Sequence, residues 1–95
     1  MHVIHRVGVD LVGRIATVEW QVFDRRAGQA IGEPSVVPVL EVVDEVMKGG
    51  RVAMATPDGY LRGAEVTVFA DESGHEWIRL NSDGAPSLHD LPRLS

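Results

Sequence analysis

The strongest constraint on the fold is a regular alternation of apolar and polar residues from position 14 to position 24. One side of this segment, taken as extended chain, carries Ala16, Val18, Trp20 and Val22. The other side carries Thr17, Glu19 and Gln21. A strand with one apolar and one polar face is typical of an antiparallel sheet that has one face against the core. The alternation therefore predicts such a strand, with Trp20 in the core.

Further strands are predicted where short apolar runs lie between turn residues. These runs cover residues 3–9, 29–33, 51–56, 64–70 and 75–80. Residues 71–74 predict the loop of a hairpin, whose apolar face carries Val66, Val68, Ile78 and Leu80. Near the C-terminus, Leu88 and Leu91 are expected to dock on the body of the protein.

One helix is predicted at about residues 36–48. Its apolar positions follow helical spacing and are Val36, Val39, Leu40, Val43, Val46 and Met47. Ser35 is expected to be the N-cap, with Pro38 in the first turn; an alternative start makes Pro38 the first helical residue. Gly49 and Gly50 are expected to end the helix. The predicted class is α+β: a small twisted antiparallel sheet of about five strands with this helix packed on one face.

Composition limits the function. The chain has 95 residues, enough for a single domain over residues 1–95 with one core. Nine Lys and Arg against fourteen Asp and Glu give a net charge of −5, which argues against a surface for nucleic acid. The absence of cysteine excludes disulfides and thiolate chemistry. No apolar stretch is long enough to cross a bilayer and no signal segment is recognisable, so we expect a cytoplasmic protein with no membrane partner.

No motif predicts catalysis, a cofactor or a metal. The histidines, which lack the spacing of metal ligands, are His2, His5, His75 and His89. The carboxylate pairs considered for acid–base chemistry are Glu41 with Glu45, Asp71 with Glu72, and Glu65 with Glu76 across the hairpin. Nucleophile-elbow and phosphate-loop motifs do not occur. We therefore expect no catalytic, cofactor-binding or metal-binding residues, and a protein that is not an enzyme.

Arg25 and Arg26 form the only basic pair, and we interpret them as part of a solvated turn. A nucleic-acid surface would require that several arginines gather on one face. Those considered are Arg6, Arg14, Arg25, Arg26 and Arg51.

Three residues predict an interaction surface. If the helix covers the apolar face of the hairpin, then Phe69, Trp77 and Arg79 are left on its outer face. Large aromatic residues beside arginine are typical of protein interfaces. The alternative is that a loop or the C-terminal tail covers the two aromatic rings.

The second half of the chain resembles a small bacterial and phage family known as domain of unknown function family 3892. The matching phrases are Gly49-Gly50 after the helix, Trp77-Ile78-Arg79-Leu80, Asn81-Ser82-Asp83-Gly84 and Leu88-His89-Asp90-Leu91-Pro92. The chain departs from the family pattern at Asn81, where the family has Thr, and at Pro86-Ser87, where it has Asp-Asn. The resemblance covers roughly residues 14–92 and implies a stand-alone small protein without catalytic apparatus.

The sequence thus favours a non-enzymatic module that self-associates, as a dimer above all, or binds another protein. Open sheet edges, which often pair across a two-fold axis, support this hypothesis. The alternative is a small ligand- or nucleic-acid-binding regulator of phage or mobile-element origin. A third hypothesis, an enzyme or metal protein using histidine and carboxylate, has no motif in its favour.

Overall fold

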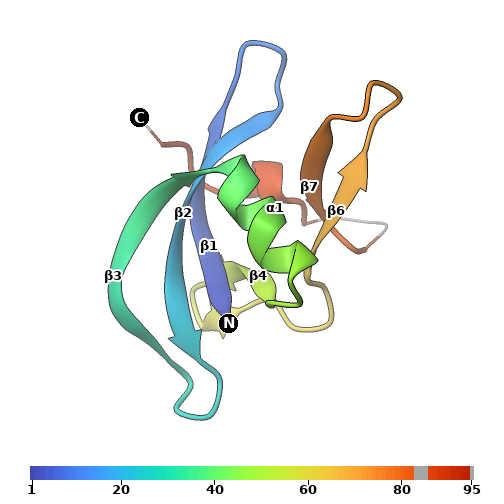
Figure 1. Ribbon diagram of the computed structural model, residues 1–95. Coiled ribbons are helices and arrows are strands. Elements are labelled where there is room, and N and C mark those ends of the chain that lie inside the picture. The colour runs from blue at the N-terminus through green and yellow to red at the C-terminus, as the bar shows by residue number, and fades with distance from the viewer. Residues whose placement is uncertain (83–85, 95) are drawn as a thin grey trace.

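The architecture is given by a computed structural model that describes residues 1–82 and 86–94 (Figure 1). In chain order its elements are β1 (His2–Val9), β2 (Ile15–Asp24), β3 (Gln29–Pro38), α1 (Val39–Met47), β4 (Val52–Thr56), β5 (Gly59–Tyr60), β6 (Val66–Ala70), β7 (Glu76–Leu80) and the 3₁₀ helix η1 (Leu88–Asp90). The predicted α+β class is confirmed.

The strands form two sheets. Five strands lie in the order β3-β2-β1-β4-β5, and β6 pairs with β7 in a separate two-stranded sheet. The prediction of a wholly antiparallel sheet is wrong at one place, because β1 and β4 are parallel. The reason is that α1 carries the chain from β3 across the sheet, and such a crossover returns the next strand in the parallel direction.

The C-terminal segment completes the edge of β1. β4 pairs with β1 only along residues 2–4. Farther along the same strand, Val7 N donates to Pro92 O at 3.0 Å and Leu94 N donates to Val7 O at 2.9 Å. Leu88 and Leu91 are buried in the core, which confirms that they dock on the body of the protein.

The helix begins later than predicted. β3 continues through Ser35 to Pro38, and α1 begins at Val39, so Ser35 is not the N-cap. Pro38 occupies that position in extended geometry, with φ −68° and ψ 155°. Pro38 disfavours helical geometry at Val37, which explains why the strand persists up to this point. The predicted end is confirmed, because Gly49 adopts a φ of 94° two residues after the helix.

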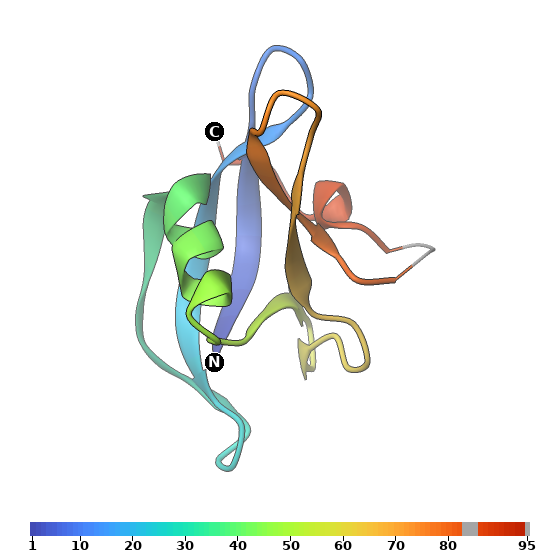
Figure 2. The same ribbon diagram turned by 45° about the vertical axis from the view of Figure 1, so that its right-hand side comes forward.

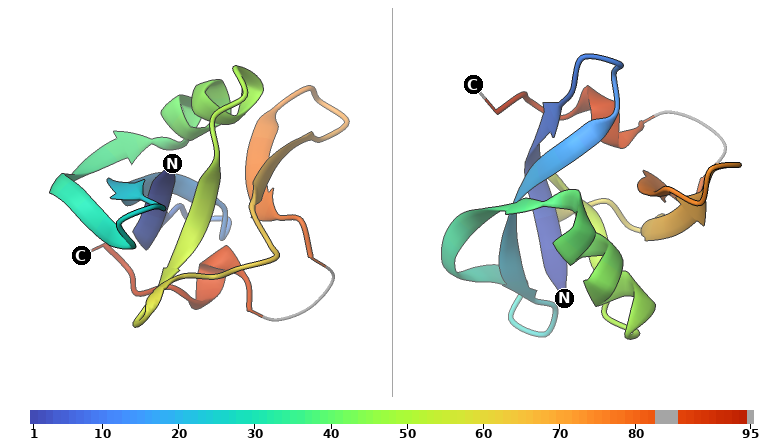
Figure 3. Two further views of the ribbon diagram at one scale, coloured as in Figure 1. Left: turned by 90° about the horizontal axis from the view of Figure 1, so that it is seen from below. Right: turned by 45° about the horizontal axis from the view of Figure 1, so that its top comes forward.

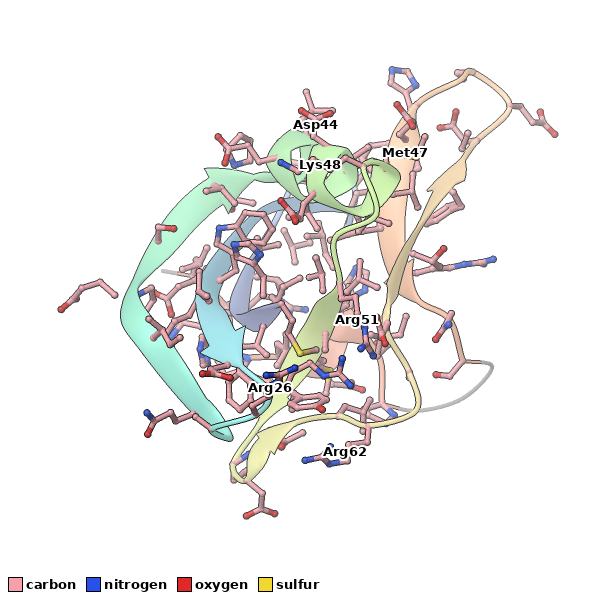
Figure 4. All side chains as sticks on the ribbon, turned by 60° about the horizontal axis from the view of Figure 1, so that its bottom comes forward. Arg26, Asp44, Met47, Lys48, Arg51 and Arg62 are labelled. Carbon is pink, nitrogen blue, oxygen red and sulfur yellow. The ribbon has the colours of Figure 1, made fainter. Side chains whose placement is uncertain are left out.

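The buried face of the helix is also shifted from the predicted one. The residues that α1 turns toward the core are Val39, Val42, Val43 and Val46. Leu40 and Met47, predicted to pack inside, are 61% and 68% exposed, and Val36 on β3 is 58% exposed. Figure 4 shows Met47 with Asp44 and Lys48 at the outer side of the helix. The prediction failed because it extended the helical stripe back to residue 36, which belongs to a strand.

The burial pattern of β2 departs from strict alternation after Trp20. Trp20 is buried, as predicted, but Val22 on the same predicted face is 44% exposed. Its neighbour Phe23 is buried instead. The pairing of β2 with β3 shifts by two residues between Trp20 and Val22, where β3 has an irregularity that contains Gly32.

The core lies between the larger sheet, α1, the β6–β7 hairpin and the η1 segment (Figures 2 and 3). Val66, Ile78 and Leu80 of the hairpin belong to the same buried cluster as Val42 and Val43 of α1. The condition on which the predicted interaction surface depends, that the helix covers the apolar face of the hairpin, is therefore met. In the part of the chain that the structure describes, no helix is long and apolar enough to span a membrane.

Candidate functional site

Two hairpin loops with the same construction stand at one end of the molecule (Figures 1 and 2). The first connects β1 to β2. Asp10 Oδ1 accepts hydrogen bonds from Val12 N and Arg14 N, both at 3.0 Å. Asp10 N donates to Arg14 O at 2.8 Å, and Gly13 supplies the left-handed conformation that the loop needs, with φ 85°.

The second loop connects β6 to β7 and repeats this pattern. Asp71 Oδ1 accepts from Ser73 N at 2.9 Å and from His75 N at 3.0 Å. Asp71 N donates to His75 O at 3.0 Å, and Gly74 has φ 83°. In both loops one carboxylate oxygen accepts hydrogen bonds from two backbone amides of the turn, and these bonds hold the loop in one shape.

The two loops differ in what they display. The first presents Leu11 and Val12, which are 106% and 75% exposed. The second presents Glu72 and Ser73, which are exposed and polar. Only the first loop therefore offers aliphatic side chains to a partner.

A concave surface of about 210 Å³ lies between the bases of the two loops, and we call it the aromatic hollow. Its principal lining residues are Arg14, Ile15, Phe69, Trp77, Ile78 and His89. A surface of this kind, apolar with a few polar groups at its margin, is the usual form of a binding site.

The structure brings together the three residues predicted as an interaction surface. Phe69 and Trp77 are direct partners across the β6–β7 ladder and both are half-buried. The Arg79 guanidinium lies 5.0 Å from the centre of the Phe69 ring, and that of Arg14 lies 4.3 Å from the Trp77 ring. His89 of η1 forms part of the wall, with Nε2 2.8 Å from Gly13 O. The sequence offered two alternatives, an exposed outer face or rings covered by a loop or the C-terminal tail. The structure lies between them, because the β1–β2 loop and the C-terminal segment flank the rings without burying them.

Trp77 is fixed by a hydrogen bond as well as by packing. Its indole Nε1 donates to Asp71 Oδ2 at 3.2 Å. This bond lowers the pKa of the Asp71 carboxyl, against the opposing effect of desolvation; the amides of His75 and Ser73 and the charge of His75 lower it further. The carboxylate therefore joins the ring to its own loop.

Within the described residues, no three histidine or carboxylate side chains gather as the ligands of a metal ion would. His2 stacks on Trp20 with ring centres 4.1 Å apart, and burial lowers its pKa. His5 Nε2 lies 2.9 Å from Gln21 Oε1. Both histidines are therefore engaged in contacts on the sheet.

The structure does not bring together Glu65 and Glu76, the carboxylate pair considered across the hairpin. Glu76 faces Ala70 at one end of the β6–β7 ladder. Glu65 lies just beyond the other end, where its carboxylate accepts from Arg51 Nε at 3.0 Å. This bond lowers the pKa of Glu65.

The sequence places the apolar Leu11 and Val12 in a turn over residues 10–13, but their exposure as an aliphatic tip was not predicted. The signal was available, since the phrases Asp10-Leu11-Val12-Gly13-Arg14 and Asp71-Glu72-Ser73-Gly74-His75 share Asp and Gly at the same spacing. Recognition of a common loop would have placed the two aliphatic residues at a rigid, solvent-facing turn.

No protein-family model matches the chain, and no solved structure matches it. The chain is similar to the bifunctional purine biosynthesis protein PurH of Anaeromyxobacter sp. strain K and to those of Anaeromyxobacter dehalogenans strains 2CP-1 and 2CP-C. Each is 36% identical over 47 residues, which is 50% of this chain and 9% of the relative. The resemblance to domain of unknown function family 3892 stays a prediction, and two of its residues, Asp83 and Gly84, lie outside the described part of the chain.

Proposed function

We propose that the protein is a non-enzymatic module that self-associates as a dimer through the end carrying the aromatic hollow. Each copy would place Leu11 and Val12 against the hollow of the other. The observation that carries this proposal is the juxtaposition, on one surface, of an exposed aliphatic tip and an apolar hollow. The absence of cysteine suits a cytoplasmic setting for such a module.

The tip is suited to binding because its shape is already fixed. The two hydrogen bonds to Asp10 hold the loop that presents Leu11 and Val12. A preorganised loop loses little conformational entropy when it binds. Burial of a fully exposed leucine contributes roughly 1.5–3 kcal/mol. The tip therefore offers binding energy that the isolated chain does not use.

The hollow is suited to receiving such side chains. Its volume of about 210 Å³ is larger than the roughly 150 Å³ apolar cavity that admits a benzene ring. Phe69, Trp77 and Ile78 give it an apolar lining, and Trp77 is held by Asp71. An aliphatic side chain placed there would gain packing contacts with these three side chains.

Tip and hollow on the same end also satisfy the geometry of a two-fold dimer. In such a dimer one patch contacts its own copy, so residue i of one chain meets residue j of the other and the reverse. Gly13 and Arg14 belong to both features, as part of the loop and as part of the lining. One rotation could therefore engage both tips and both hollows.

The open edge of β3 is a weaker place for association. It is a ten-residue edge strand whose side chains are mostly exposed. However, Pro34 and Pro38 remove two amide donors from it, and Gly32 interrupts it with φ 73°. Prolines and irregular backbone are the usual protection of an edge strand against pairing.

The test is native mass spectrometry together with sedimentation velocity at about 50 µM untagged protein. We expect a dimer for the parent chain. The variant Leu11→Asp should weaken dimerisation by at least roughly 100-fold, because each dimer loses two buried aliphatic side chains and gains two desolvated carboxylates. The matched control is Leu40→Asp, since Leu40 is also exposed, at 61% against 106% for Leu11, but lies on α1.

A parent chain that stays monomeric at this concentration would contradict the proposal. Equal weakening by Leu11→Asp and Leu40→Asp would contradict it too, because it would point to a general effect of charge. Trp77→Ala gives a second check: it should weaken association while circular dichroism shows the fold retained. If Trp77→Ala unfolds the chain, the decision rests on Leu11→Asp alone, whose side chain is outside the core.

A further inference from the structure

A second concave surface lies at the opposite end of the molecule, where the β2–β3 turn meets the β4–β5 hairpin. It has a volume of about 620 Å³, and we call it the arginine depression. The side chains that define it are Phe23, Asp24, Arg25, Arg26, Tyr60 and Arg62. Figure 4 looks onto this end and labels Arg26 and Arg62.

The depression concentrates positive charge in a chain whose net charge is −5. Three of the nine basic residues line it, against one carboxylate, that of Asp24. Asp24 Oδ1 is already occupied by Arg26 N at 2.9 Å and Ala27 N at 3.2 Å. The carboxylate thus shapes the turn that presents Arg25 and Arg26.

Among the described residues, three of the other six basic side chains are neutralised by a carboxylate, and this difference sets the depression apart. Arg6 pairs with Glu19, Lys48 with Glu45, and Arg51 with Glu65. Arg14 and Arg79 lie over aromatic rings at the other end. Within residues 1–82 and 86–94, none of the three arginines of the depression makes an ion pair with a carboxylate. The interpretation of Arg25 and Arg26 as part of a solvated turn therefore left out that they line one depression together with Arg62.

Arg62 is held in place on the wall of the depression. Its guanidinium lies 4.7 Å from the centre of the Tyr60 ring, and Nη1 donates to Tyr60 Oη at 2.9 Å. Tyr60 in turn packs edge-on against the buried Phe23, with ring centres 5.4 Å apart. A guanidinium has five N–H donors, so this bond leaves most of them for a ligand. Its position is fixed before any ligand arrives.

We propose that the arginine depression binds the phosphate group of a small organic phosphate monoester. Planar guanidinium groups form paired, charge-assisted hydrogen bonds with phosphate oxygens. Three such groups provide more donors than the two oxygens of a carboxylate can accept, and they match the three terminal oxygens of a phosphate monoester. The depression is a local feature rather than a basic stripe, and an extended polyanion would meet the acidic remainder of the surface.

The probe for the test is adenosine 5′-monophosphate, with adenosine and benzoate as comparison compounds, in ¹⁵N-edited NMR titrations at low salt. We expect saturable shifts with adenosine 5′-monophosphate at the amides of residues 23–27 and 59–62. Inorganic phosphate should compete for the same amides. Adenosine and benzoate should bind at least roughly tenfold more weakly, since loss of a charge-assisted hydrogen bond has about that effect.

Matched variants locate the binding. Arg26→Gln and Arg62→Gln should each weaken binding roughly tenfold. Arg79→Gln removes the same charge from the other end and should leave affinity within about twofold. All three side chains are exposed, so each variant should retain the fold, which its amide spectrum will show.

Three results would overturn the proposal. The first is equal binding of adenosine and adenosine 5′-monophosphate, which would show that the phosphate is not recognised. The second is equal weakening by Arg79→Gln and Arg62→Gln, which would show an effect of overall charge. The third is an affinity for a single-stranded oligonucleotide at least about 100-fold above that for the monophosphate, which would assign the surface to nucleic acid. The amides of residues 23–27 and 59–62 lie at the end opposite the aromatic hollow, so this test is independent of the dimer proposed above.

Discussion

The two ends of the molecule differ in the contacts that their cationic side chains make. At the end with the aromatic hollow, Arg14 and Arg79 each lie over a ring, and Trp77 donates its N–H to Asp71. At the end with the arginine depression, Arg62 lies over Tyr60. Arg25 and Arg26 on the β2–β3 turn make no ion pair among the described residues. The same two residue types, arginine and aromatic, thus produce an apolar surface at one end and a charged one at the other.

This difference teaches that the groups around each cation, rather than the number of cations in the chain, decide what a surface can bind. A cation that covers a ring gives up part of its field to that ring and shields the ring from water. A cation with no opposing charge keeps its field and attracts anions. Salt should therefore weaken ligand binding at the arginine depression and leave association at the aromatic hollow nearly unchanged.

The largest expected effect concerns stability and compares a buried with an exposed leucine at the end with the aromatic hollow. Leu88 is 2% exposed and supports the η1 segment that forms a wall of the aromatic hollow. Leu88→Ala should lower the free energy of unfolding by about 3 kcal/mol, because it removes buried methyl groups and leaves a cavity. Urea unfolding measures this loss. Leu11→Ala, which removes the same atoms from a fully exposed position, should change it by less than about 0.5 kcal/mol, and equal losses would contradict the assignment of Leu88 to the core.

An intermediate effect concerns pH and only the end with the aromatic hollow. The folded-state pKa of Asp71 is lowered from 3.8, first by the bond from the Trp77 indole. The stabilisation is therefore fully present above about pH 4 and is lost as the pH falls through the lower folded-state pKa. The Nε1–H resonance of Trp77 should move in that range, while that of buried Trp20 serves as reference.

The control for this pH effect is Asp71→Asn, which keeps an oxygen acceptor but does not titrate. In that variant the Trp77 resonance should no longer follow a single titration at acid pH. A titration that persists unchanged in Asp71→Asn, or that Trp20 shares in full, would show that the cause is global unfolding instead of the Asp71 carboxyl.

The smallest effect reaches the arginine depression through charge, from an ion pair that lines neither surface. Glu65 neutralises Arg51, and their hydrogen bond lowers the pKa of the carboxyl. Glu65→Gln should cost at most about 1 kcal/mol of stability, as is usual for exposed ion pairs. It also releases one positive charge, so affinity of the arginine depression for adenosine 5′-monophosphate should rise by less than about threefold. A fall in that affinity would contradict the electrostatic description of the depression.

Much of the fold could be predicted because its signals are local. The alternation around Trp20, the hairpin of β6 and β7, and the glycine after α1 each depend on a few neighbouring residues. The start of the helix could not be predicted, because residues 34–38 carry an apolar spacing compatible with both strand and helix, and pairing with β2 decided between them. The wrong prediction that Leu40 packs inside followed from that error.

The candidate site was predictable in part for the same reason. Phe69, Trp77 and Arg79 share one strand pair, so period-two reasoning was sufficient to group them. The arginine depression was not predictable, because Arg26 and Arg62 come from turns 36 positions apart that only the five-stranded order of the sheet brings together.

The bonds of Val7 to Pro92 and Leu94 have a consequence for how the chain acquires its structure. Pro92 and Leu94 lie 85 and 87 positions after Val7, so synthesis supplies them long after Val7 itself. Until then the distal half of β1 remains without its neighbour on that side, and pairing over such a long sequence separation slows folding. The strand at the centre of the sheet is therefore completed late, and the aromatic hollow, whose wall includes η1, is assembled only once η1 has been made.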